Sequence, residues 1–154
     1  MSGPILCAVD FSADSEAALL WACSQAELTG SNLVLLHVVH DPAASPGFYR
    51  RPGGDWPRPL TDVALEMQQE FLDKVRSDHP SQAALQSLET RIVTGLPPSR
   101  IVELATEIEA SLIVVGSRGR TGLPHVLLGS VAERVVQIAT IPVTVVKQAP
   151  GPAT

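Results

Sequence analysis

The chain contains few aromatic residues and few cysteines, and both shortages narrow the classes of protein to which it can belong. Aromatic residues make up only 4% of its 154 residues, so a core must be built from aliphatic side chains. The two cysteines, Cys7 and Cys23, form no CxxC pair and no spacing typical of a metal site. We expect both to be small buried residues in a reduced compartment.

Long apolar runs and basic clusters are also missing. No run approaches the roughly 20 residues that a membrane-spanning helix needs, and the N-terminus does not resemble a signal peptide. Lysine and arginine number 11 against 16 aspartates and glutamates, which gives a net charge of -5 and argues against a dedicated nucleic-acid binder. We therefore expect a cytoplasmic protein whose partners include neither nucleic acid nor a membrane.

What the chain does have is a regular alternation of apolar runs and amphipathic stretches. Hydrophobic residues reach 45%, enough to bury one core. Helical periodicity separates five short apolar runs, at residues 4–9, 33–39, 88–94, 111–115 and 141–146. Such alternation predicts an α/β fold, a parallel sheet with helices on both faces and right-handed crossovers. We expect the Rossmann-like strand order 3-2-1-4-5, which follows from the fold class and not from any single residue.

The most informative stretch is "GSRGRTGLPHVLLGSVAERVV", at residues 116–136, which places four glycines within fourteen residues. Gly116 and Gly119 can take positive φ and let another group approach the backbone. Gly129 and Ser130 precede a helix, and the unpaired N–H groups of a helix N-terminus bind phosphate well. The stretch therefore predicts an anion-binding loop after the fourth strand, opposite Asp10 at the end of the first.

Two arginines of this loop, Arg118 and Arg120, can add charge-assisted hydrogen bonds to phosphate oxygens. Each feature also has a simpler interpretation, since the arginines can be solvated and Ser130 with Glu133 forms a capping box. The loop is not a P-loop, because a P-loop has a lysine between its last glycine and the following Ser or Thr. Here Leu128 precedes Gly129, and Ser130 follows Gly129 directly. A GxGxxG pattern does not follow the first strand either.

Taken together, these segments resemble the universal stress proteins, a family of small α/β proteins. Its nucleotide-binding members carry the pattern G-x2-G-x9-G-[S/T], which Gly116, Gly119, Gly129 and Ser130 match without a gap. The resemblance also includes "ILCAVDFSADSEAAL", "LVLLHVV", "GLPPSRIVELA" and "GSVAERVVQIATIPVTVVK". We expect one such domain over residues 1–147 and a disordered tail over 148–154. The Pro-rich excursion at 41–59 is the main departure from the family pattern.

The resemblance implies a role for each matching residue. Asp10 would face the adenine and ribose, Val38 would contact the adenine edge through its backbone, and Gly116 would lie near the ribose. The phosphates would be held by Gly119, Gly129, Ser130 and Val131, with Arg118 nearby. The implied ligand is ATP, and Mg²⁺ or Mn²⁺ could accompany its phosphates.

Three functions fit these observations. The first is an ATP-binding regulatory protein of the stress response, because the residues suggest a nucleotide site but no catalytic base. The second is a slow ATPase or self-phosphorylating enzyme, which would need a positioned water or hydroxyl and usually a metal. The third is a nucleotide-free scaffold that acts through dimerisation, against which the intact glycine pattern counts.

A homodimer is expected through the last strand, Val143–Val146. This strand is apolar and β-branched, and in the expected order it lies at a sheet edge that needs pairing or protection. The alternative is that the C-terminal tail covers the edge. His37 is interpreted as a packed histidine with a local partner, and Trp21 as a core residue.

Overall fold

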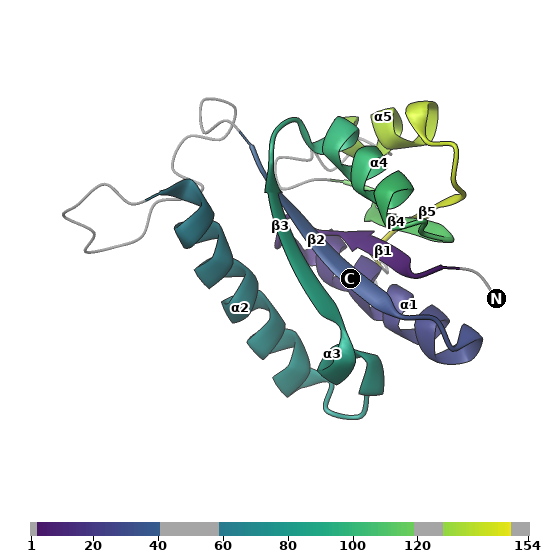
Figure 1. Cartoon of the computed structure of the whole chain (residues 1–154). Helices are drawn as coiled ribbons and strands as arrows, with labels where there is room; N and C mark the ends of the chain where they lie inside the picture. Colours follow the sequence, from purple (N-terminus) through teal and green to yellow (C-terminus); the bar gives the residue numbers. More distant parts are fainter. Residues whose placement is uncertain (1–2, 41–58, 119–127, 149–154) are drawn as a thin grey trace, which may run out of the picture.

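The computed structural model describes residues 3–40, 59–118 and 128–148. Its five strands form one parallel sheet in the order β3-β2-β1-β4-β5, which confirms the predicted fold (Figure 1). The strands are β1 (Ile5–Ala8), β2 (Leu33–Val39), β3 (Glu89–Thr94), β4 (Leu112–Gly116) and β5 (Val143–Val146). The helices are α1 (Ala13–Thr29), α2 (Leu60–Asp78), α3 (Ala83–Ser87), α4 (Pro97–Glu107) and α5 (Ser130–Ile138).

Helices cover both faces of the sheet, with α1, α2 and α3 on one side and α4 and α5 on the other (Figure 1). Successive residues of a strand point to opposite faces. Cys7 and Leu35 therefore pack with α1, whereas Leu6 and Leu36 pack with α4 and α5. The core is almost entirely aliphatic, as the scarcity of aromatic residues predicts.

Both cysteines are buried and unpaired, as expected. Burial raises the pKa of both thiols, so each stays neutral at physiological pH and neither is an activated nucleophile. Trp21 is partly buried against the hydrophobic cluster that contains Cys7 and Cys23, in agreement with its interpretation as a core residue.

The ends of α1 follow local rules. Ser12 is the N-cap and accepts a hydrogen bond from the Ser15 N–H, and Gly30 ends the helix in a left-handed conformation with φ 69°. The capping-box interpretation of Ser130 is wrong, because Gly129 is the N-cap of α5 and Ser130 is its first helical residue. Helix α3 was not expected, since five residues after a proline turn carry too little periodicity to predict a helix.

No helix in the described ranges is long and apolar enough to cross a membrane. Several predictions lie outside these ranges. They concern the Pro-rich excursion except for Pro59, the tail beyond Gln148, and the loop residues Gly119 and Arg120.

Candidate functional site: a crevice at the carboxyl ends of β1 and β4

The strand order reverses beside β1, which pairs with β2 on one side and with β4 on the other. The chain therefore leaves the carboxyl ends of β1 and β4 in opposite directions, and a crevice opens between them. The residues that follow these two strands, Asp10 and Gly116 with its neighbours, form opposite walls of the candidate site.

Asp10 is fixed by hydrogen bonds to the first turn of α1. Its Oδ1 accepts from the Ser15 hydroxyl at 2.6 Å and from the Ser12 N–H at 3.1 Å. The Ser15 hydroxyl oxygen in turn accepts from the Asp10 N–H at 2.8 Å. Because backbone and side chain are both anchored, the carboxylate is oriented before any ligand arrives.

Phe11, between Asp10 and the α1 cap, has φ 69°, a conformation that is uncommon for a residue other than glycine. Its ring stacks on His37 with the centroids 4.3 Å apart and also lies 5.5 Å from the ring of Phe71. Packing of the ring compensates for the unfavourable backbone conformation and holds the turn that carries Asp10.

His37, in β2, is buried, and its Nδ1–H donates to the Val9 carbonyl at 2.8 Å. This confirms its interpretation as a packed histidine with a local partner. Burial lowers the pKa of His37, although the hydrogen bond to Val9 and the nearby Asp10 act in the opposite direction. The imidazole also lines the crevice, a position that could not be predicted from the sequence.

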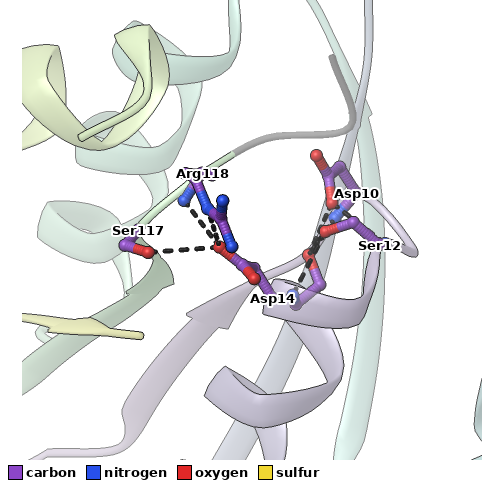
Figure 2. Close-up of polar contacts among 6 residues, drawn as sticks. Asp10, Ser12, Asp14, Ser117 and Arg118 are labelled. Atoms are coloured by element: carbon purple, nitrogen blue, oxygen red, sulfur yellow. Dashed lines mark hydrogen bonds and ion pairs between the residues drawn. The ribbon is translucent and has the colours of Figure 1, made fainter. Parts of the chain in front are cut away.

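A second aspartate, Asp14, lies in the first turn of α1 and contacts the opposite wall (Figure 2). Its Oδ2 accepts from the Ser117 hydroxyl at 3.1 Å, from the Arg118 N–H at 3.0 Å and from Arg118 Nε at 3.4 Å. Its side chain is only 6% exposed. This carboxylate thus ties the start of the glycine loop to the N-terminus of α1.

The structure corrects the predicted reason for glycine at position 116. Gly116 does not have positive φ; among the described residues the glycines with positive φ are Gly30 and Gly95. Instead, a Cβ at Gly116 would lie 3.0 Å from the carbonyl carbon and oxygen of Asp14. Close packing of β4 against the first turn of α1 therefore favours glycine here, because the backbone of Asp14 would have to move to admit a Cβ.

The N-terminus of α5 forms the third part of the site. Gly129 is extended, with φ -70° and ψ 161°, and no side chain caps the helix. The Gly129 N–H donates to the Ser117 carbonyl, which joins the two described ends of the glycine loop. The first N–H groups within α5 thus lack the side-chain acceptor that Ser12 gives α1.

One cavity collects five of the predicted residues: Asp10, Val38, Gly116, Arg118 and Val131. They come from β1, β2, β4 and α5, and so the fold brings together segments more than a hundred residues apart. Gly129 and Ser130 adjoin Val131 but do not line the cavity. Gly119 lies outside the described residues.

Most of the lining that the sequence did not single out is apolar. The remaining residues are Ala8, Val9, Ser15, His37, Pro97, Ile101, Val115 and Ala132. Pro97 and Ile101 come from α4, and Ile101 also packs in the core between α4 and the sheet. An apolar slot with a few polar groups at its ends is typical of a small-molecule site.

No group of three or more His, Cys, Asp or Glu side chains that could hold a metal ion occurs in the described part of the chain. The carboxylates nearest the crevice, Asp10 and Asp14, hydrogen-bond to different partners on opposite sides of it. The expected Mg²⁺ or Mn²⁺ would therefore depend on ligand phosphates, and it stays a prediction.

These features define an open α/β protein with a ligand crevice at the reversal point of its sheet, and comparison with known proteins narrows the class. The model described as the universal stress protein family matches residues 1–147. Universal stress protein YxiE of Bacillus subtilis is 32% identical over 149 residues, 96% of this chain and 100% of the relative. The chain belongs to the universal stress protein family.

Two further relatives add detail. Universal stress protein Rv2623 of Mycobacterium tuberculosis is 37% identical over 145 residues, and the match covers 94% of this chain. It covers only 45% of that relative, so the chain spans about half of its length. The solved universal stress protein from Archaeoglobus fulgidus in complex with dAMP is 28% identical and has a TM-score of 0.64. The match covers 94% of this chain and 98% of that one.

Proposed function

We propose that this chain, as one domain over residues 1–147, is an adenine-nucleotide-binding regulatory protein whose ligand is ATP. The observation that carries the proposal is the convergence of Asp10, Val38, Gly116, Arg118 and Val131 on one cavity. The dAMP complex of the Archaeoglobus relative supports an adenine nucleotide as the ligand class. The mostly apolar lining offers an adenine ring a surface to pack on, and Asp10, Ser15, His37 and Arg118 add polar groups to it.

Charge supports one orientation of the nucleotide. The N-terminus of α1 already has Asp10 and Asp14 at its first turn, and both carboxylates would repel a phosphate. The N-terminus of α5 has one carboxylate in its first turn, Glu133, which is exposed, and no side chain caps it. We therefore place the nucleoside beside Asp10 and the phosphates at Gly129, Ser130 and Val131, with Arg118 and Gly119 completing this end.

A regulatory role suits this arrangement better than catalysis. Asp10 is oriented by Ser12 and Ser15 at the nucleoside end, far from where a water would attack a terminal phosphate in this orientation. Slow hydrolysis or self-phosphorylation remains the competing hypothesis, with Mg²⁺ or Mn²⁺ held through the phosphates.

We also propose a homodimer through β5. The two edges of the sheet differ, because β3 presents Glu89 and Arg91 whereas β5 is the apolar Val143–Val146. Charged residues discourage strand pairing at the β3 edge, whereas no charged residue lies within β5 itself. Pro142 and Val146 face β4 through their carbonyls, so the N–H of Val145 points to the open edge. Replacing Val145 by proline would remove this edge donor and is expected to shift the protein to monomer in sedimentation velocity. A parent protein that is monomeric at tens of micromolar, with and without ATP, contradicts the dimer.

The proposed ligand is tested on the protein as purified. Nucleotide released by denaturation should be identified as adenine nucleotide by absorbance and mass. Titration calorimetry on nucleotide-free protein should then give saturable binding of ATP. Protein that carries no nucleotide and binds neither ATP nor adenosine contradicts the proposal. Phosphate release measured with ATP in large excess over protein separates binding from turnover.

A further inference from the structure

The hydrogen bonds of Asp14 suggest a task for a residue that does not itself line the crevice. Asp14 is absent from the cavity wall, and its buried carboxylate cannot meet a ligand there directly. Yet three donors from Ser117 and Arg118 converge on its Oδ2. A buried carboxylate is costly unless it is well compensated, and here the N-terminus of α1 and the Arg118 guanidinium both compensate it.

Ser117, one of the two residues that donate to Asp14, connects the end of β4 to three other elements. Its hydroxyl donates to Asp14 in α1, and its N–H donates to the Val146 carbonyl in β5 at 2.9 Å. Its carbonyl accepts from the Gly129 N–H, at the start of α5. The relative position of α1, the end of β4 and the N-terminus of α5 therefore depends on one buried serine and its contact with Asp14.

The contact with Asp14 orients Arg118 but leaves other N–H groups of its guanidinium available to a ligand. Only Nε and the backbone N–H of Arg118 reach Asp14, whereas a guanidinium carries five N–H groups. Arg118 lines the cavity, and its side chain is 33% exposed. A guanidinium held at Nε can therefore still donate to an anion in the crevice.

We propose that Asp14 and Ser117 are positioning residues for the phosphate end of the nucleotide site. This inference rests on the proposed function. Neither residue touches the ligand; they act by fixing Arg118 and by setting where the N-terminus of α5 lies. The nucleoside end has its own anchors, since Asp10 is held by Ser12 and Ser15. Loss of the Asp14–Ser117 contact should therefore weaken the binding of phosphates and spare the binding of the nucleoside.

The test compares ATP with adenosine in NMR titrations, which also measure weak affinities. Ser117→Ala removes the hydroxyl without changing charge, and Asp14→Glu keeps the charge but displaces the carboxylate. Each is expected to weaken ATP binding about tenfold, the loss of one charge-assisted hydrogen bond, and to change adenosine binding less than about twofold. The double variant should bind ATP no more weakly than Asp14→Glu alone, because the Ser117 hydroxyl acts through the carboxylate that Asp14→Glu has already displaced.

The ratio of the two affinities decides the outcome. Equal losses for ATP and adenosine would make the contact merely structural and overturn the inference, as would ATP affinity that does not change in Ser117→Ala. If Asp14→Glu does not fold, Ser117→Ala alone decides, with normal adenosine binding as its proof of folding. A parent protein that binds ATP while the variants match it contradicts only this inference, whereas a parent that binds neither ligand overturns the proposed function as well.

Discussion

The two sides of the crevice are built in different ways, and the glycines Gly116 and Gly129 show the difference. At Gly116 a Cβ would press on the backbone of Asp14, so the packing of the fold favours glycine. Gly129 is extended, with a φ that any residue can adopt, so its backbone does not require glycine. We infer that Gly116 serves folding and that Gly129 serves the ligand, although both belong to one sequence pattern.

The same contrast extends to the helix that starts on each side. The first turn of α1 is capped by Ser12 and satisfied by its own side chains. That of α5 has no side-chain cap. Substitutions at the α1 side, where the helix start is already capped, should therefore lower stability. Substitutions at the α5 side, where the N–H groups lack a side-chain cap, should lower ligand affinity.

The largest effect is expected for Gly116→Ala. The new methyl group would lie 3.0 Å from backbone atoms of Asp14, which cannot move away without shifting α1. We expect a loss of about 1–3 kcal/mol in the free energy of unfolding, measured by urea denaturation followed by circular dichroism. An unchanged denaturation midpoint would show that β4 and α1 separate easily, and the contrast with Gly129 would disappear.

Gly129→Val should have the opposite profile. A branched side chain at the entrance to α5 would occupy space beside the N–H groups that phosphate needs, so ATP affinity should fall by at least about tenfold. Stability should stay close to that of the parent, because φ at this position is ordinary. Val136→Ala, an exposed change in the same helix, is the control and should bind normally. Normal ATP binding by a folded Gly129→Val protein would contradict our placement of the phosphates.

Asp10→Asn tests the nucleoside end. The amide cannot reproduce the acceptor pattern of a carboxylate, so we expect ATP and adenosine to lose affinity by a similar factor, about tenfold. Any hydrolysis per bound ATP should be unchanged. Asp62→Asn, at an exposed carboxylate in the first turn of α2, serves as the control. A variant with normal affinity and abolished turnover would instead make Asp10 a catalytic residue.

Part of this architecture could be predicted from the sequence. The strands, the parallel sheet and the cap of α1 follow from apolar periodicity and from single residues such as Ser12 and Gly30, whereas the strand order follows only from the fold class. The contact between Asp14 and Ser117 could not, because it joins side chains 103 residues apart and depends on how closely β4 packs on α1. The reason for glycine at position 116 could not be predicted either, because the sequence does not show which residue packs against the Cα of Gly116.

A smaller effect compares the two helix starts directly. Ser12→Ala should cost about 1 kcal/mol of stability, because Ser12 is the N-cap of α1. Ser130→Ala should change stability little, since Ser130 is not the cap of α5. Thermal unfolding of both variants at one pH measures the difference. Equal losses would mean that Ser130 stabilises its helix in a way that the capping geometry does not reveal.

The smallest effect concerns His37, on the floor of the crevice. Because the folded state lowers its pKa, the unfolded chain binds more protons as pH falls below the ordinary value of 6.5. The contribution of His37 to stability is thus complete above that pH and decreases below it. We expect the melting temperature to fall between pH 7.5 and 5.5, and to fall less in His37→Gln. A His37→Gln protein that keeps the full pH dependence of the parent would contradict this assignment.

The central claim, that an adenine nucleotide binds with its phosphates at α5, is tested most directly by ¹⁵N NMR titration of the parent protein. ATP should shift the amide signals of Asp10, Val38, Arg118, Ser130 and Val131. Adenosine should shift those of Asp10 and Val38 while leaving Ser130 and Val131 nearly unchanged. Shifts from both ligands that cluster away from the crevice, or ATP shifts at Asp10 without any at Ser130 and Val131, would contradict the account.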